Sequence, residues 1–379
     1  MVSTSATNRL STLLIANRGE IAIRVIRSAR AAGIRTVAIH TDLDVSAPHV
    51  RAADVAVPVG SYLDIDAVVA AAVSAGADAI HPGYGFLSER SAFARAVEAA
   101  GLKLVGPSSA VMDQMGRKDA AREIAVAAGV AVVPSWSLET PASELAYPVL
   151  VKAAAGGGGK GMRIVRSAGE YPGAREAAAR EAANAFGDDT LLIEKCVESG
   201  RHIEVQVMAD THGNVVHLFE RDCSTQRRHQ KVLEEAPAPT ITAEIRAAVT
   251  SAAVALAAKV GYENAGTVEF LLDTATGEAY FLEMNTRLQV EHPVTELAVT
   301  VNGEHPDLVA LQLRVAAGEP LGFGQEDVAL AGHAIEARVY AEDSFGGFLP
   351  QAGTTSIVRW PERVRVDQAL EPGQVVSTA

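Results

Sequence analysis

Residues 266–285, GTVEFLLDTATGEAYFLEMN, decide the fold class of this chain. Two apolar-rich runs flank residues 275–277, Ala-Thr-Gly, a three-residue loop with glycine at the left-handed position that such loops prefer. The spacing predicts a β-hairpin in which Glu269 lies opposite Glu283, with Asn285 on the same face. Facing carboxylates repel each other unless a cation lies between them. The hairpin therefore predicts a Mg²⁺ site, with Mn²⁺ as the second choice and a solvated pair on an exposed face as the alternative.

A basic stretch and a glycine run precede the hairpin. Residues 221–239, RDCSTQRRHQKVLEEAPAP, concentrate positive charge in a chain of net charge -13, which predicts an anion site; a solvated charged loop is the alternative. Residues 156–161, GGGGKG, do not match the Walker A pattern, because Gly161 rather than Ser or Thr follows Lys160. Glycines still allow backbone N–H groups to wrap phosphate oxygens, and Lys152 at the end of the preceding strand can reach a phosphate. A floppy loop is the alternative interpretation.

The segment after the hairpin, residues 285–293, places polar groups in a run that should be buried. Arg287 offers a planar fork for a small oxyanion, and Glu291 is suited to act as a base. A structural ion pair between the two is the alternative. Together with the glycine run, this predicts an ATP site with a second anion beside it.

Composition and length narrow the class of protein. The 379 residues are enough for two or three domains, and 48% hydrophobic with 21% charged residues is ordinary for a globular protein. Two cysteines cannot form a disulfide framework, which favours a reducing compartment. The apolar run at residues 13–16 is too short for a signal peptide, and no apolar stretch is long enough to span a membrane. We therefore expect a cytoplasmic protein that binds neither membranes nor, given its negative charge, nucleic acid.

Strands alternate with helices in the first hundred residues. Strands are expected at 13–16, 36–40, 79–81 and 102–105, with helices at 20–32, 67–75 and 91–100, which predicts a parallel sheet covered on both faces. The first turn lacks GxGxxG, so no dinucleotide site is expected there. Further on, a helix at 118–128 and strands at 149–152, 162–165, 191–194 and 203–208 predict a mixed, largely antiparallel region. Strands at 334–340 and 355–360 predict a third, β-rich unit.

Taken together, these motifs resemble the biotin carboxylases, the ATP-grasp component of biotin-dependent carboxylases. The resemblance rests on IANRGEIA at 15–22, HPGYGFLSE at 81–89, the glycine run, the basic stretch, EMNTR at 283–287 continuing to residue 296, and GHAIEAR at 332–338. It implies an α/β fold: a Rossmann-like domain at 1–112, an ATP-grasp domain at 113–330 with a glycine-loop lid at about 130–205, and an incomplete, truncated C-terminal domain at 331–379. Residues 297–307 are longer than the family's usual turn. The alanine-rich sequence is similar to the N-terminal part of an actinobacterial acetyl- or propionyl-CoA carboxylase alpha subunit.

The resemblance also implies roles for individual residues. The ATP contacts would be Lys118, Lys152, Gly158, Gly159, Glu194, Lys195, Cys196, Val197, His202, Gln226 and His229. Glu269, Glu283 and Asn285 would bind the metal. Bicarbonate would contact Lys231, Arg287, Gln289 and Val290, with Glu291 as base; Arg338 would stabilise the biotin enolate near Tyr84. Lys231, Arg287, Glu291 and Arg338 are thus the implied catalytic set.

The implied reaction is the ATP- and bicarbonate-dependent carboxylation of biotin through carboxyphosphate. The implied cofactors are ATP and Mg²⁺, and biotin enters as a substrate on a carrier. The implied partners are a biotinylated carrier, a second copy of the chain and a carboxyltransferase subunit. Arg24 and Arg27 lie where relatives dimerise. Two rival functions remain open: another ATP-grasp ligase, or a noncatalytic or truncation-disabled nucleotide-binding module.

Overall fold

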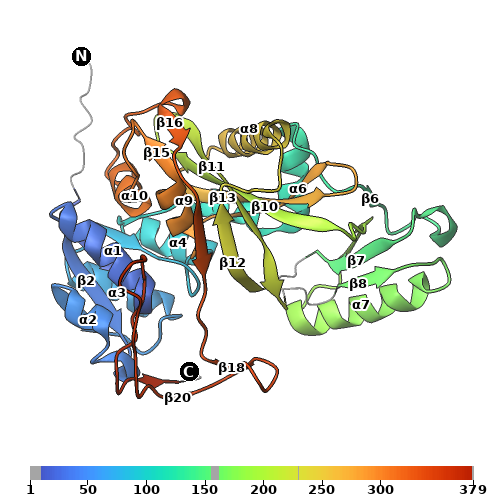
Figure 1. The fold of residues 1–379 in the computed structure, drawn as a ribbon. Coiled ribbons are helices and arrows are strands. Elements are labelled where there is room, and N and C mark those ends of the chain that lie inside the picture. The colour runs from blue at the N-terminus through green and yellow to red at the C-terminus, as the bar shows by residue number, and fades with distance from the viewer. Residues whose placement is uncertain (1–9, 155–161, 229, 378–379) are drawn as a thin grey trace.

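The computed structural model describes residues 10–154, 162–228 and 230–377. Within these residues the fold is mixed α/β, with a five-stranded parallel sheet, antiparallel sheets of six and four strands, and three two-stranded sheets (Figure 1). This confirms the predicted fold class. The domain boundaries given above stay a prediction.

The N-terminal part is a parallel sheet of order β3-β2-β1-β4-β5. Side chains of β1 alternate: Leu13 packs in the core that includes Val25 of α1, whereas Leu14 packs in the core that includes Phe93 of α4. Helices therefore cover both faces, as predicted. The elements are β1 Thr12–Ile15, α1 Gly19–Ala31, β2 Arg35–His40, α2 Pro48–Ala52, β3 Val55–Pro58, α3 Ile65–Ser74, β4 Ala79–His81, α4 Ser91–Ala99 and β5 Lys103–Leu104.

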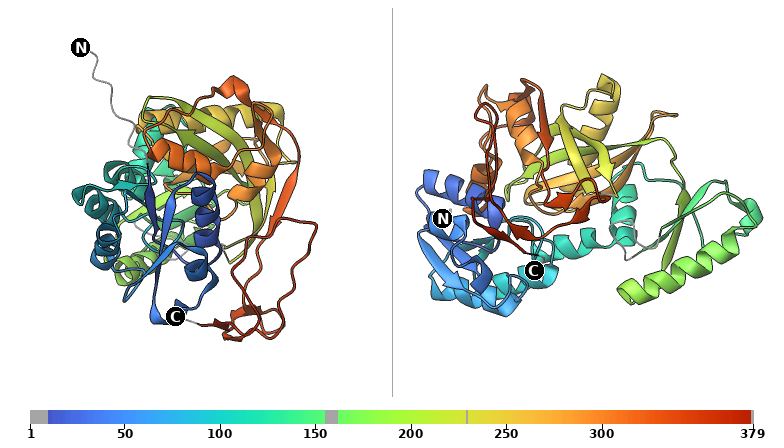
Figure 2. Two further views of the ribbon diagram at one scale, coloured as in Figure 1. Left: turned by 90° about the vertical axis from the view of Figure 1, so that its left-hand side faces the viewer. Right: turned by 60° about the horizontal axis from the view of Figure 1, so that its bottom comes forward.

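Two helices, α5 Ser109–Gly116 and α6 Lys118–Ala127, lead to a four-stranded antiparallel sheet that we call the lid. The lid contains β6 Ser135–Trp136, β7 Val149–Ala153, β8 Arg163–Val165, α7 Tyr171–Phe186 and β9 Leu191–Lys195. Its own core includes Val149, Ala178 and Ile193. The lid projects away from the rest of the molecule (Figure 1 and the right view of Figure 2). The predicted strands at each end of the glycine run are confirmed, while the run itself, at 156–161, lies outside the described residues.

A six-stranded antiparallel sheet, of order β14-β13-β10-β11-β12-β17, forms the centre of the molecule. Val205 of β10 and Phe270 of β13 point to one face, where they share a core with Leu256 of α8. The opposite face carries the polar residues that alternate with them, such as Glu204 and Glu269. The elements are β10 Gly200–Ala209, β11 Val215–Arg227, β12 Gln230–Ala236, α8 Ala243–Lys259, β13 Asn264–Asp273 and β14 Ala279–Asn285.

The hairpin β13–β14 has the predicted pairing but not the predicted loop. Asp273 N donates to Glu278 O at 2.8 Å, so the loop contains four residues, one more than predicted. Near the loop the register is shifted, with Leu272 opposite Ala279. A β-bulge at Leu282 reverses the shift, and Glu269 lies opposite Glu283. The predicted loop length was wrong, and the bulge is why the predicted carboxylate pair forms nevertheless.

The remaining elements pack against the N-terminal part and the central sheet. They are α9 His292–Ala298, β15 Val299–Val301, α10 Leu308–Ala316, β16 Val328–Leu330 and β17 Ala334–Ala337, followed by the short strands β18 Glu342–Asp343, β19 Leu349–Pro350, β20 Gly353–Thr354 and β21 Val375–Val376. The long 297–307 segment forms β15 and a tight turn at Asn302 and Gly303, both with positive φ. β17 joins the central sheet instead of a separate unit. The predicted strand at 355–360 was wrong, because no described strand pairs with it.

Candidate active site

A row of charged residues crosses the polar face of the central sheet. Arg221 of β11 pairs in register with Glu204 of β10, which pairs with Glu269 of β13, which pairs with Glu283 of β14. Direct register partners on one face have side chains within reach of each other. The strand pairing therefore brings three carboxylates and one guanidinium together, in a row of mainly negative charge.

Lys231, near the start of β12, supplies a cation to this row. Its ammonium donates to Glu204, to Glu269 Oε1 at 3.1 Å and to Glu291 Oε1 at 2.6 Å. Burial opposes its charge, but the three carboxylates outweigh burial and hold the pKa of Lys231 well above its ordinary value. Burial likewise acts to raise the pKa of Glu269, but Lys231 and His202 lower this pKa by more than burial raises it. Glu269 is therefore ionised at neutral pH.

Arg221 is the largest fully buried side chain of the chain as described. Its guanidinium donates to Glu204 Oε1 at 2.7 Å, Gln289 Oε1 at 2.7 Å and Gln206 Oε1 at 2.8 Å. It therefore fixes the side chain of Gln289, a predicted bicarbonate contact. Arg221 was predicted only as part of a basic stretch, and Glu204 was missed; strand pairing of β10 with β11 was the signal required.

The segment that follows β14 folds over the charged row. Gln289 Nε2 donates to Glu269 Oε1 at 3.1 Å, and half-buried Val290 lies between Gln289 and Glu291. The Arg287 guanidinium lies 3.0 Å from Glu89 Oε2 and donates to Asn285 Oδ1 at 3.2 Å. The alternative prediction, an ion pair between Arg287 and Glu291, is wrong. Arg287 does form an ion pair, but its partner is Glu89 of the HPGYGFLSE motif.

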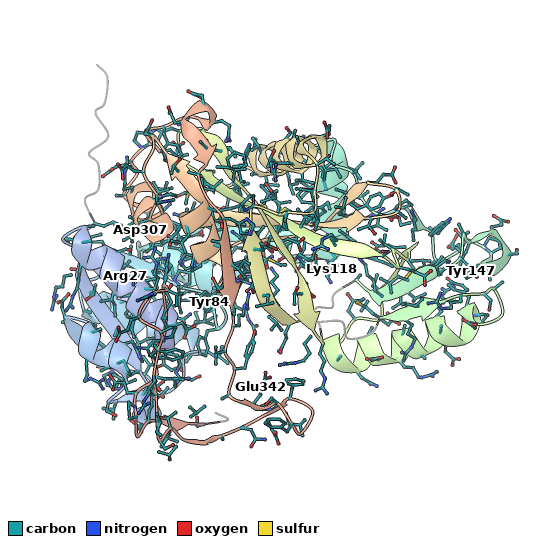
Figure 3. The ribbon with its side chains drawn as sticks, in the orientation of Figure 1. Arg27, Tyr84, Lys118, Tyr147, Asp307 and Glu342 are labelled. Atoms are coloured by element: carbon teal, nitrogen blue, oxygen red, sulfur yellow. The ribbon has the colours of Figure 1, made fainter. Side chains whose placement is uncertain are left out.

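Arg338 and Lys231 occupy both oxygens of Glu291. Arg338 Nη2 donates to Glu291 Oε2 at 3.0 Å, and Arg338 Nε donates to Glu234 Oε1 at 2.6 Å. Tyr84 lies beside β17 and donates its hydroxyl to Glu20 Oε1 at 2.5 Å (Figure 3). Burial and the charge of Glu20 raise the pKa of Tyr84 far above neutrality, so the phenol stays protonated. The structure thus brings together the predicted residues Lys231, Glu291, Arg338 and Tyr84.

The donor set for a divalent cation is made of oxygens. Burial, together with the charge of Glu269, raises the pKa of Glu283 more than Lys118 lowers it, as expected where two carboxylates face each other. Asn285 Nδ2 donates to Glu269 Oε1 at 2.7 Å, so the third predicted ligand touches the same pair. Carboxylate and amide oxygens beside a phosphate site suit Mg²⁺. The residues therefore fit the group that the sequence predicts.

Two other groupings bring candidate ligand atoms within 4.8 Å among the described residues: His202 with Glu204 and Glu269, and Glu204 with Cys223 and Glu291. The Lys231 ammonium contacts Glu204 in both groupings, and it also contacts Glu269 and Glu291. Burial raises the pKa of the Cys223 thiol well above its ordinary value. Lysine supplies the positive charge in both, so neither requires a metal.

Several of the predicted ATP contacts come from the lid and from the elements that join it to the central sheet. Lys118 lies at the start of α6 (Figure 3), where burial lowers its pKa while Glu283 raises it. Lys152 Nζ of β7 lies 2.6 Å from Glu194 Oε2 of β9, and Lys195 Nζ lies 3.2 Å from Asp273 Oδ2. Cys196 N donates to Pro148 O at 3.0 Å, and Val197 follows it at the junction with β10.

Two further predicted ATP contacts lie on the central sheet. His202 Nε2 lies 2.9 Å from Glu269 Oε2, beside the metal pair, and Gln226 Nε2 donates to Cys223 O at 2.9 Å. Burial lowers the pKa of His202, but the charge of Glu269 raises it by more, so the pKa lies above its ordinary value. Gly158, Gly159 and His229 lie outside the described residues.

Comparison with known proteins identifies the family. Residues 9–112 match the model for the N-terminal domain of biotin carboxylase, and residues 90–323 match that for the ATP-binding domain of the carbamoyl-phosphate synthase L chain. A pyruvate carboxylase subunit of Methanothermobacter thermautotrophicus is 49% identical over 95% of this chain and 75% of its own length. The chain belongs to the biotin carboxylase family.

Other biotin carboxylase relatives agree. The mitochondrial methylcrotonoyl-CoA carboxylase alpha subunit of Oryza sativa subsp. japonica is 53% identical over 96% of this chain and 51% of its own length. The chain thus spans about half the length of most of the curated relatives it matches. The biotin carboxylase domain dimer of Hydrogenobacter thermophilus 2-oxoglutarate carboxylase, in complex with MgADP, ADP and bicarbonate, superposes with a TM-score of 0.90 at 45% identity, over 97% of this chain and 83% of that one. Campylobacter jejuni biotin carboxylase, bound to β-γ-ATP, gives 0.90 at 42% identity, over 97% and 84%.

No helix in the described part of this biotin carboxylase chain is both long and apolar enough to cross a membrane. The resemblance to an actinobacterial protein in particular stays a prediction.

Proposed function

We propose that this chain catalyses the first half-reaction of a biotin-dependent carboxylase. Bicarbonate attacks the γ-phosphate of ATP, giving ADP and carboxyphosphate. Carboxyphosphate then breaks down to CO₂ and phosphate; the phosphate takes the proton of a biotin ureido N–H as that nitrogen bonds to the CO₂. The observation that carries the proposal is the charged row on the central sheet, where Lys231 and Arg338 contact Glu291, with the charge of Arg221 nearby, beside the Glu269–Glu283 pair.

In this proposal, Glu269, Glu283 and Asn285 hold Mg²⁺, which supplies charge neutralisation for the phosphates when bound. Lys118, Lys152, Gly158, Gly159 and His229 bind phosphates, and residues 194–197 receive the adenine, with His202 and Gln226 near the ribose. The preorganised cations act where negative charge develops, in a site from which side chains exclude much of the water.

Glu291 has to be released before it can act as a base. Both of its oxygens accept from cations, Lys231 at 2.6 Å and Arg338 at 3.0 Å. Bicarbonate carries a negative charge of its own and competes for these cations, as well as for Arg287. When Lys231 turns to bicarbonate, Glu291 Oε1 is freed to accept the bicarbonate proton. Substrate binding thus creates the base that the reaction requires.

The partners follow from the same reaction. The carboxylated biotin would be carried by a separate carrier domain or protein to a carboxyltransferase subunit, in a cytoplasmic, reducing compartment. A homodimer is part of the proposal. Arg24 does not supply a free dimer contact, because it is 3% exposed and paired within the chain to Glu296 at 2.7 Å and Asp307 at 2.8 Å. Arg27, on the same helix, is 57% exposed, and its Nη2 lies 3.5 Å from Asp367 Oδ1 of the same chain, so a dimer contact would share this guanidinium with Asp367 (Figure 3).

The test is ADP release from Mg-ATP with bicarbonate alone, biotin alone, and both. We expect ADP release to require bicarbonate and to increase with biotin. ADP release that requires an amine or another carboxylate would favour another ATP-grasp ligase. Tight nucleotide binding without ADP release under any condition would favour a noncatalytic module.

A further inference from the structure

Two carboxylates that the proposed reaction does not use face each other beside Arg338. Glu234 of β12 and Glu336 of β17 are direct register partners in the antiparallel pair. Glu234 is fully buried. One oxygen of each carboxylate, Oε2, is buried and has no hydrogen-bond partner among the described residues. An unsatisfied buried carboxylate oxygen is costly when it carries charge, and much less so when it carries a proton.

The charges around the pair do not balance. Arg338 is the cation in contact with Glu234, and it also serves Glu291. The charged and titratable groups that face the pair come from five parts of the fold: Arg338 after β17, Glu291 at the start of α9, Glu204 of β10, Arg221 of β11, and Tyr84 after β4. Burial, with Glu291 adding to it and Arg338 opposing it, raises the pKa of Glu234 to about 7. Burial and the charge of Glu234 raise the pKa of Glu336 to about 8.

We propose that Glu234 and Glu336 share one proton near neutral pH, and that this proton determines how strongly the pair holds Arg338. The second half of this proposal rests on the proposed function. Two carboxylates that interact this closely titrate as a unit. With the proton bound, the pair carries one negative charge. With the proton lost to solvent through the partly exposed Glu336, it carries two.

The consequence concerns the positioning of Arg338. When the pair carries one charge, the guanidinium divides between Glu234 and Glu291 and can turn toward negative charge that develops on biotin. When the pair carries two charges, Arg338 is held at the β12–β17 edge, and new negative charge beside it is disfavoured. Biotin-dependent turnover should therefore fall as the pH rises through the titration of the pair. Glu234 and Glu336 are positioning residues in this account, acting through Arg338.

In the variant Glu336→Gln only Glu234 can ionise, so the pair never carries more than one negative charge. Loss of the like-charged neighbour also makes Glu234 easier to ionise, which lowers its pKa. Glu235→Gln is the matched control, because Glu235 is adjacent on β12 and pairs with His333 Nε2 at 2.6 Å instead. The first measurement is the infrared carboxylic-acid signal across pH 6 to 9. We expect a titrating signal in the wild type and in Glu235→Gln that Glu336→Gln lacks. The difference between proteins isolates the pair, because Glu283 also has a raised pKa.

The second measurement is the pH profile of the biotin-dependent rate in the three proteins. We expect the wild type and Glu235→Gln to lose about tenfold per pH unit above the titration of the pair, and Glu336→Gln to stay nearly level to pH 9. The ratio of Glu336→Gln to wild type should therefore rise about tenfold between pH 7 and 9. No titrating carboxylic acid above pH 6 overturns the shared proton. Identical pH profiles in Glu336→Gln and wild type overturn the control of Arg338. The wild type could show the titrating carboxylic-acid signal and yet form no ADP with bicarbonate and biotin. That result would refute the proposed function and the control of Arg338, while the shared proton would stand.

Discussion

Replacing Lys231 with methionine tests the charge balance of the site most severely. The ammonium, whose side chain is 13% exposed, contacts three carboxylates that are each at most 7% exposed. Removing one partner from a buried ion pair costs about 3–5 kcal/mol, because it leaves an uncompensated buried charge. We expect the free energy of unfolding of Lys231→Met to fall by about 3 kcal/mol at pH 8. This corresponds to a change of about a hundredfold in the unfolding equilibrium.

The loss should depend on pH in a defined direction. In the wild type, Lys231 helps to lower the pKa of Glu204 and of Glu269 below the ordinary 4.5, so their stabilisation is present above pH 4.5 and is lost as the pH falls. Arg221 still contacts Glu204 and His202 still contacts Glu269 without Lys231, but we expect burial and mutual repulsion to outweigh them and to raise these pKa values above 4.5. Ionising the carboxylates then destabilises the fold increasingly as the pH rises from 4.5 to the new folded-state pKa. The deficit of the variant should therefore be larger at pH 8 than at pH 5.

The assay is urea unfolding at pH 5 and pH 8, together with bicarbonate-dependent ADP release. Lys103→Met is the matched control, because Lys103 forms a single ion pair, with Glu263, and is 37% exposed. Exposed pairs of this kind contribute about 0–1 kcal/mol. ADP release by Lys231→Met should fall by about 10²–10³-fold, the usual effect of removing one preorganised donor. A deficit below about 1 kcal/mol at pH 8, or an equal deficit at both pH values, would refute the reasoning.

Three further changes have defined outcomes. Arg287→Lys replaces a planar fork with a point charge, so the KM for bicarbonate should rise about tenfold or more while ATP affinity changes little; an unchanged KM would argue against the assigned contact. Glu283→Gln removes a carboxylate whose pKa is raised by burial and by Glu269, so the variant should be more stable than the wild type without metal at pH 8 but not at pH 4. It should also raise the Mg²⁺ concentration for half-maximal ADP release about tenfold or more. Phe270→Ala, 1% exposed in the core beneath α8, should lower the unfolding free energy by about 3–5 kcal/mol in urea titrations, whereas Phe345→Ala, fully exposed, should change it by less than about 0.5 kcal/mol.

Local periodicity predicted the elements that lie close together in sequence. Four of the five strands of the N-terminal sheet, the lid strands on either side of the glycine run and the left-handed Gly277 were predicted from alternation and turn chemistry, and the predicted strand ends agree with the structure to within one residue. β3 was not predicted. The strand at 355–360 was wrong because a strand requires a partner, and local sequence does not report whether one is present.

The site depends on pairing over long distances, and sequence reasoning reached only part of it. The Glu269–Glu283 pair was found because a short hairpin connects its strands, although a bulge was needed to restore the register. The Glu204–Arg221 pair also belongs to a hairpin, because residues 210–214 connect β10 to β11 with Gly213 at positive φ, but this turn was not used in the sequence prediction. The Glu89–Arg287 ion pair joins segments about two hundred residues apart, for which no short-loop signal exists. The shared environment of Glu234 and Glu336 required the pairing of β12 with β17, some hundred residues apart.

Transfer of label from [¹⁴C]bicarbonate to biotin in the presence of Mg-ATP tests the central claim most directly. The measurement compares the wild-type chain with Lys231→Met and Lys103→Met. The account predicts acid-labile labelled carboxybiotin, formed with ATP and not without it, by the wild type and the control but not by Lys231→Met. Labelling by Lys231→Met at the wild-type rate, or ATP-driven ADP release by the wild type without any label in biotin, would contradict it.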